Sequence, residues 1–208
     1  FIRLGQELGP ERVREMAVRL GFGRALNLAD TLSTAAGQLP EAETLTSSGA
    51  FANFCFGQGE LLATPIQIAA MMNTIAAGGI WREPLFLECT LDETTGEPLT
   101  ALAHRGTRRV FSAQTARALR ELLASVVTEG TGHEAAPTEG TAAGKTGTAQ
   151  TGQFAAGKEL KNYWFAGFYP ARNPRYTIVV LQDGQTGPSR TSAAIFARVC
   201  DALDAAGE

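Results

Sequence analysis

Residues 144–150 read GKTGTAQ and place a lysine beside two threonines. If this stretch is a strand, Thr146 and Thr148 point to the same side, because side chains alternate along a strand. Two hydroxyl donors beside an ammonium group make a ledge that can bind a carboxylate. Gly147 removes the side chain between them, so a second peptide backbone could lie along the strand as an added strand. Simple alternation places Lys145 on the opposite face, from which only its long side chain could reach the threonines.

The same stretch has to be weighed against a phosphate-binding loop. That motif needs a glycine six residues before the lysine and a helix after it. The first position holds Glu139, Gly140 comes one residue too late, and TGTAQTGQF after Lys145 has no apolar helical stripe. The sequence therefore favours a strand over a nucleotide site. On spacing alone, an ordinary edge strand with a surface lysine explains the stretch better than a binding ledge does.

Composition bounds the class of protein. With 208 residues and 44% hydrophobic content, the chain can bury the core of one domain. The net charge of -3 gives no basic surface, so we expect no nucleic-acid partner. The cysteines are far apart and the histidines are isolated, so we expect no metal site, no disulfide framework and no cofactor. The cysteines and His133 are expected to be structural or surface residues; the cysteines are Cys55, Cys89 and Cys200.

Helices must position the lysine–threonine stretch. Apolar residues at helical spacing, together with capping residues, predict helices over 10–20, 65–77, 113–129 and 191–205. The segment 27–56 has little periodicity and is expected to be mostly loop with short turns. The side chains expected to face the core are Val13, Met16, Ala17 and Leu20 in the first helix, Ile68, Met71, Met72 and Ile75 in the second, and Ala116, Leu119, Leu122, Leu123 and Val126 in the third.

Strands are predicted on both sides of the third helix. Residues 81–111 are typical of two or three short strands, with a hairpin turn at DETTGEP. Residues 144–150, 163–169 and 176–182 are rich in β-branched and aromatic residues or alternate in polarity, and predict three successive antiparallel strands. The side chains expected to pack the middle strand against helices are Trp164, Phe165 and Phe168. The expected fold class is α+β, an antiparallel sheet packed with helices.

Four stretches together resemble the transpeptidase domain of penicillin-binding proteins, closest to the class B type. They are KTGT at 145–148, GQGELLATPIQIAAMMNTIAAGG at 57–79, VVTEGTG at 126–132 and LGQELGPERVREMAVRLGFG at 4–23. The resemblance covers nearly the whole chain in the family's order. It implies the fold shared by serine β-lactamases and transpeptidases, with two further sheet strands from outside this stretch.

The resemblance also implies an activity and roles for residues. Such enzymes form an acyl-serine with peptidoglycan stem peptides ending in D-Ala-D-Ala, transfer the acyl group to an amine, and are the targets of β-lactam antibiotics. It implies that Lys145 supports the proton network around the serine, and that Thr146 and Thr148, on either side of Gly147, hold the substrate carboxylate. The backbone N–H of Thr148 would form half of the oxyanion hole. The parent protein is expected to be anchored in the cell membrane, with the catalytic domain outside the cytoplasm.

One departure from the family pattern limits what this chain is expected to do alone. The family needs S-x-x-K and S-x-N motifs, which supply the nucleophile, and no serine stands at the required spacing before any lysine or asparagine. We therefore expect 1–208 to be the C-terminal part of a transpeptidase domain, inactive without the N-terminal part, with an exposed strand edge that favours self-association. The alternatives are a non-catalytic module that binds β-lactams or peptides, or a purely structural module.

Two parts of the 57–79 segment are interpreted differently. Thr64, Pro65 and Gln67 have the spacing of a helix N-cap with a capping box, and we expect them to be structural. For Gly57, Gln58 and the glycine that follows, the sequence leaves open whether they are scaffold or the wall of a binding site.

Overall fold

The computed structural model describes residues 1–29, 32–87, 89–101 and 106–207. Its largest sheet has three antiparallel strands in the order β7-β8-β9, as predicted, and the α+β fold class is confirmed. β7 (Ala143–Ala155) and β8 (Lys158–Tyr169) form one long hairpin, and β9 (Tyr176–Gln185) follows on the far side of β8. The first two strands are longer than predicted, because the Gly- and Lys-containing stretch between them continues the ladder to Ala155 and Lys158.

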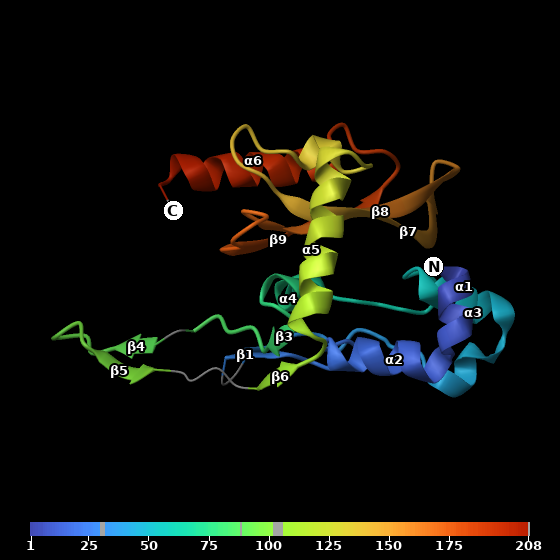
Figure 1. The fold of residues 1–208 in the computed structure, drawn as a ribbon, viewed down its shortest axis with the longest axis horizontal. Helices are drawn as coiled ribbons and strands as arrows, with labels where there is room; N and C mark the ends of the chain where they lie inside the picture. Colours follow the sequence, from blue (N-terminus) through green and yellow to red (C-terminus); the bar gives the residue numbers. More distant parts are fainter. Residues whose placement is uncertain (30–31, 88, 102–105, 208) are drawn as a thin grey trace.

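Helices cover both faces of this sheet (Figure 1). α6 (Ser192–Ala205) lies on one face, where Phe165 and Phe196 pack with their ring centroids 4.7 Å apart. α4 (Pro65–Ala76) lies on the opposite face, where Phe168 packs with Met72. Phe165 and Phe168 are an odd number of positions apart on β8, so they face opposite cores, as the period of two along a strand requires.

A long helix joins the sheet to the rest of the molecule. α5 (Ala113–Thr128) begins at Ser112, whose hydroxyl accepts a hydrogen bond from the Thr115 N–H at 3.0 Å. It crosses from the small sheets to the three-stranded sheet (Figure 1). Its C-terminal turn contributes the buried Val127 to the core under α6. This packing fixes where the chain re-enters the large sheet after the helix.

The remaining elements form smaller layers. A third core surrounds the fully buried Trp81, whose indole N–H donates to the Leu20 carbonyl at 2.9 Å. A fourth core joins Phe51 and Phe54 to residues of α2. The other elements are α1 (Ile2–Leu8), α2 (Pro10–Arg19), β1 (Asn27–Ala29), β2 (Leu32–Ser33), η1 (Ala42–Thr46), α3 (Ser48–Cys55), β3 (Ile80–Arg82), β4 (Cys89–Leu91), β5 (Pro98–Ala101), β6 (Thr107–Arg109) and η2 (His133–Ala135).

Several sequence predictions are wrong in detail. The segment 27–56 is not mostly loop, since it contains α3 and a 3₁₀ turn held by the Phe51 and Phe54 core rather than by local periodicity. Leu122 is 64% exposed and Met16 is 37% exposed, although both were predicted to face the core.

The predicted hairpin near DETTGEP is present as β4 and β5, and Asp92 accepts backbone hydrogen bonds within its turn.

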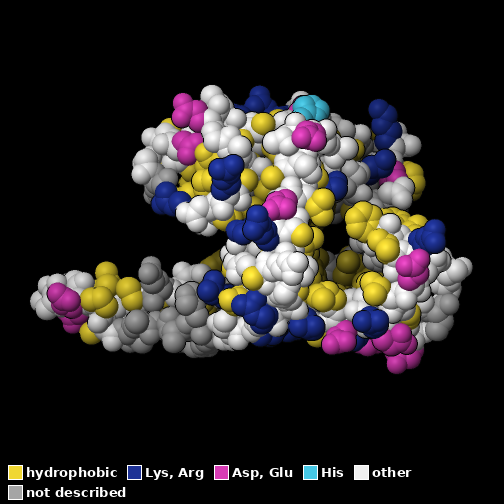
Figure 2. All heavy atoms as spheres, viewed as in Figure 1, with side chains coloured by type: hydrophobic (Ala, Val, Ile, Leu, Met, Phe, Trp, Pro, Cys, Tyr) yellow, Lys and Arg dark blue, Asp and Glu magenta, His cyan; other side chains and the backbone are white. Residues whose placement is uncertain are grey.

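The exposed surface includes apolar groups. Figure 2 shows hydrophobic side chains gathered over α1 and along the projecting β4–β5 hairpin. Exposed members of these two groups are Phe1, Ile2, Leu4, Leu8, Leu91 and Leu99. Among the described residues, no helix is long and apolar enough to cross a membrane.

Candidate functional site

The lysine–threonine stretch lies near the start of β7, on one edge of the three-stranded sheet (Figure 1). β8 pairs with one side of β7 and sets Lys145 opposite Ala166 and Thr148 opposite Tyr163. None of the described strands pairs with the other side of β7. The strand predicted at 144–150 is therefore confirmed, and no helix follows Lys145 as a phosphate loop would require.

Gly144 determines how closely β7 lies on β8. A Cβ atom at this position would lie 2.5 Å from Phe165 Cε1 and 2.8 Å from the backbone oxygen of Ala166. Phe165 is fully buried and the Ala166 oxygen belongs to the backbone, so neither can move aside at low cost. Only glycine fits here, and the close approach holds the next four residues in register on the edge.

The Lys145 ammonium group folds back onto its neighbour in the strand. Its Nζ lies 2.9 Å from Thr146 Oγ1 and 3.1 Å from the Thr146 carbonyl oxygen, and donates to both. Alternation of Cβ positions places the two side chains on opposite faces, but the lysine side chain is long enough to reach round the strand edge. Lys145 is exposed and Thr146 is half-buried, so the ammonium and the hydroxyl meet where solvent or a ligand can reach them.

A further hydroxyl, on Thr131, joins this pair from the turn after α5. Its Oγ1 lies 3.4 Å from Thr146 Oγ1. The turn is held tightly, because the Gly132 N–H donates to the Val126 carbonyl at 3.0 Å and a Cβ at Gly132 would lie 3.2 Å from Phe165. Sequence reasoning named no site residue in this turn. The signal that could have found Thr131 is the GTG triplet directly after a helix that the sheet must contact.

Gln58 lies 90 residues before Thr148 in the sequence and contacts the same strand edge. Its side-chain Nε2 donates to the Thr148 carbonyl oxygen at 2.9 Å. Gly57 and Gly59 flank it with φ angles of 79° and 82°, which favour glycine, and the Gln58 backbone N–H donates to Asn53 at 2.9 Å. The sequence left open whether this turn is scaffold or site wall, and the hydrogen bond shows that Gln58 lies against the β7 edge.

The segment that follows is structural, as predicted. The Thr64 and Gln67 side chains form a capping box at the start of α4. Gln67 is fully buried, and its Nε2 donates to the carbonyl oxygens of Arg24 at 3.0 Å and Ala36 at 2.9 Å. With its amide saturated by backbone groups, this glutamine ties α4 to the loops around it and is not available to a ligand.

Other reactive groups lie away from this edge. Burial raises the pKa of the Cys200 thiol to about 12, so it stays protonated and inert. The hydrogen bond to Asp204 raises the pKa of Tyr169 to about 12. His133 is exposed on η2. Within the described part of the chain, no group of histidine, cysteine, aspartate and glutamate side chains could hold a metal ion.

Comparison with known proteins places this arrangement in a family. The penicillin binding protein transpeptidase domain family matches residues 1–201. The curated relatives include penicillin-binding protein PbpB of Mycolicibacterium smegmatis, 34% identical over 97% of this chain and 33% of its own length. They also include peptidoglycan D,D-transpeptidase FtsI of Escherichia coli K12, 31% identical over 87% of this chain and 29% of its own length. The chain thus spans about a third of the length of these relatives.

Solved structures agree. Penicillin-binding protein 3 of Mycobacterium tuberculosis in complex with aztreonam has a TM-score of 0.84 at 31% identity, over 99% of this chain and 48% of that one. The D,D-transpeptidase domain of a peptidoglycan glycosyltransferase from Eggerthella lenta has a TM-score of 0.81 at 27% identity, over 100% of this chain and 51% of that one. The fold is therefore that of a transpeptidase domain. The chain belongs to the penicillin-binding protein transpeptidase family.

Proposed function

We propose that this chain is the substrate-binding part of a serine-type D,D-transpeptidase domain that cross-links peptidoglycan stem peptides and is acylated by β-lactams. The observation that carries the proposal is the open edge of β7, where Lys145, Thr146 and Thr148 gather beside a strand without an outer neighbour among the described residues. Family membership supports the same reaction class.

Each residue of the edge has a role in this proposal. The Lys145 ammonium and the hydroxyls of Thr146 and Thr148 bind the terminal carboxylate of a D-Ala-D-Ala peptide or the matching carboxylate of a β-lactam. Lys145 also supports proton transfer to and from the nucleophilic serine. Gly147 keeps the edge free of a side chain, so the peptide backbone can lie alongside. The Thr148 N–H stabilises the tetrahedral oxyanion, a contact of about 3 kcal/mol in other acyl-transfer sites.

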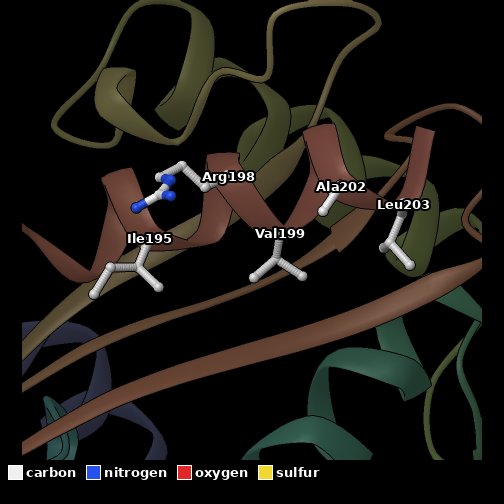
Figure 3. Close-up of a pocket in the computed structure, with 5 residues that line it drawn as sticks. All are labelled: Ile195, Arg198, Val199, Ala202 and Leu203. Atoms are coloured by element: carbon white, nitrogen blue, oxygen red, sulfur yellow. The ribbon is translucent and has the colours of Figure 1, made fainter. Parts of the chain in front are cut away.

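The nucleophile in this proposal comes from outside residues 1–208. Lys145 donates two hydrogen bonds to Thr146 and none to a serine of the described residues. The relatives are two to three times longer than the chain, which leaves room for the N-terminal part of the domain. An apolar stripe on the surface of α6 supports the proposal that the N-terminal part of the domain packs against this helix. Ile195, Val199 and Leu203 point to the same side of α6 (Figure 3), and these side chains line an open groove of about 390 Å³.

The complete protein in this proposal is anchored in the cytoplasmic membrane and works outside it, as the family resemblance implies. The relevant partners are then stem peptides, β-lactams and the N-terminal part of the domain. Crystal structures of penicillin-binding protein 3 with aztreonam and with ampicillin support the β-lactam part. The alternative is a module of the same fold that binds β-lactams or peptides without catalysis. A covalent label distinguishes the two, because only the catalytic domain forms an acyl-enzyme.

The test is labelling with a fluorescent penicillin followed by a denaturing gel. We expect residues 1–208 alone to remain unlabelled, because the serine and its base are absent. The complete domain should give a covalent band that survives denaturation. A labelled, Lys145-dependent band on the isolated chain would contradict the proposal that the nucleophile lies outside residues 1–208. A complete domain that binds penicillin only reversibly would favour the non-catalytic alternative.

A further inference from the structure

The outer edge of β7 is occupied by two of the protein's own side chains. Lys145 Nζ donates to the Thr146 carbonyl at 3.1 Å, and Gln58 Nε2 donates to the Thr148 carbonyl at 2.9 Å. Along one edge of a strand, outward-facing carbonyls recur at every second residue. Thr146 and Thr148 therefore present the two acceptors that an added peptide strand would use. Both acceptors have a donor among the protein's own side chains.

Gln58 differs from Lys145 in how firmly it is held. The lysine is exposed on β7 itself and its flexible side chain can swing away. Gln58 is half-buried and comes from the turn between α3 and α4, where its own backbone N–H is bonded to Asn53. The positive φ angles of Gly57 and Gly59 shape that turn. The backbone thus presents the amide at the edge, and it is a neutral donor with the same chemistry as a peptide N–H.

We propose that Gln58 competes with the acyl-donor peptide, because it caps the Thr148 carbonyl until a backbone N–H of that peptide replaces it. This inference rests on the proposed function. Exposed strand edges attract unwanted strands, and a capped acceptor lowers that tendency. An acyl-donor peptide with an N–H at this position replaces the Gln58 hydrogen bond with its own. A peptide without that N–H either leaves the Gln58 hydrogen bond in place or leaves the Thr148 carbonyl bonded to water. Gln58 therefore lowers the advantage that a donor with this amide N–H has over a donor without it.

The test uses the complete transpeptidase and a peptide ending in two D-alanines. A matched set of donors replaces one backbone amide at a time by an ester, which removes a single N–H. For the all-amide peptide, Gln58→Ala should raise kcat/KM about two- to tenfold, the range that one competing hydrogen bond supplies. For one ester analogue, the one that lacks the N–H opposite Thr148, the same substitution should leave kcat/KM unchanged.

Two variants separate the hydrogen bond from bulk and from general effects. Gln58→Met keeps the length of the side chain and removes the N–H, so it should match Gln58→Ala. Gln153→Ala changes an exposed glutamine farther along the same strand and should not alter kcat/KM. A gain in Gln58→Ala alone would assign the effect to volume and overturn the inference. Equal or lower kcat/KM in both Gln58 variants, at unchanged thermal stability, would also overturn it. Absence of any turnover in the unsubstituted enzyme would instead contradict the proposed function.

Discussion

The two edges of the three-stranded sheet are built for different neighbours. At the β7 edge, Gln58 and Lys145 occupy backbone acceptors with polar donors that a ligand can displace. At the β9 edge, residues 176–182 (YTIVVLQ) carry no charge, the one charged residue of the strand is Asp183 near its end, and the apolar stripe of α6 lies beside the strand. An uncharged, β-branched edge favours pairing with another strand. Under the proposed function, the β7 edge receives a peptide, and the β9 edge is covered by the N-terminal part of the domain.

The largest effect is expected at the β7 edge. In the complete domain, Lys145→Ala should lower the second-order rate of acylation by penicillin at least about 100-fold, because it removes the positive charge nearest the threonine hydroxyls. The melting temperature should change little, since Lys145 is exposed. Stopped-flow acylation and a thermal scan measure the two quantities.

Lys158→Ala is the matched control for this substitution. It removes an exposed lysine from the far end of the same hairpin and should leave the acylation rate unchanged. If both variants lost activity equally, the effect would belong to overall charge rather than to the β7 edge.

Patterns of residues close in sequence predicted the β7 strand but not the side chains that contact its edge from elsewhere in the chain. The strand at 144–150 and the capping box at Thr64 depend on residues close in sequence, so alternation and spacing were sufficient. Gln58 reaches Thr148 from 90 positions away, and no local pattern encodes that contact. The chain path through α3, which delivers Gln58, depends on tertiary packing and was mistaken for loop.

The same reasoning explains the other misses. Leu122 has perfect helical spacing for the core, yet α5 crosses the molecule and leaves this side chain exposed among the described residues. Which stripe of a helix is buried depends on the elements available to cover it, and periodicity shows only that a stripe exists. The reach of Lys145 to Thr146 is a matter of side-chain conformation, which residue types alone leave open.

A second prediction separates packing from ligand binding within β7. Gly144→Ala should destabilise the fold by about 2–3 kcal/mol, because the new methyl group would press on Phe165 and on the β8 backbone. Gly147→Ala should leave stability within about 0.5 kcal/mol, since its Cβ would lie 3.4 Å from Trp164, an ordinary contact. Urea unfolding measures both.

The activity of these two glycine variants completes the comparison. At a temperature where both are folded, Gly147→Ala should weaken peptide binding more than Gly144→Ala, because only Gly147 lies between the two proposed carboxylate ligands. Equal loss of stability in the two variants would show that β7 is uniformly packed and that its outer edge is not specially open.

A third prediction addresses the β9 side. Val199 is 37% exposed on the α6 stripe. In residues 1–208 alone, Val199→Asp should change the free energy of unfolding by less than about 0.5 kcal/mol and should reduce self-association. In the complete domain it should cost about 2 kcal/mol, because a buried carboxylate would be left without a partner. Urea unfolding and sedimentation measure these effects. Equal costs in the two forms would mean that nothing covers α6.

The smallest effect concerns the contact that holds the end of α6 to the sheet. The Tyr169 hydroxyl donates to the Asp204 carboxylate at 2.6 Å, and Tyr169→Phe should cost about 1–2 kcal/mol near neutral pH. The folded state raises the pKa of Tyr169 to about 12, above the value of about 10 in the unfolded chain. The fold therefore favours the protonated phenol. Its contribution is complete below pH 10 and is lost as the pH rises from 10 to 12.

Urea unfolding of both proteins between pH 7 and the alkaline limit tests this sign. The stability difference between the unsubstituted chain and Tyr169→Phe should shrink above about pH 10, where the unfolded tyrosine ionises. Both proteins should still lose stability above about pH 9, because burial also raises the pKa of Cys200. A difference that stays constant through pH 11 would mean that Asp204 does not hold the Tyr169 proton. The anchoring of α6 would then depend on its other contacts, among them the buried Phe196 and the Ser192 hydroxyl, which donates to the Tyr163 carbonyl at 2.9 Å.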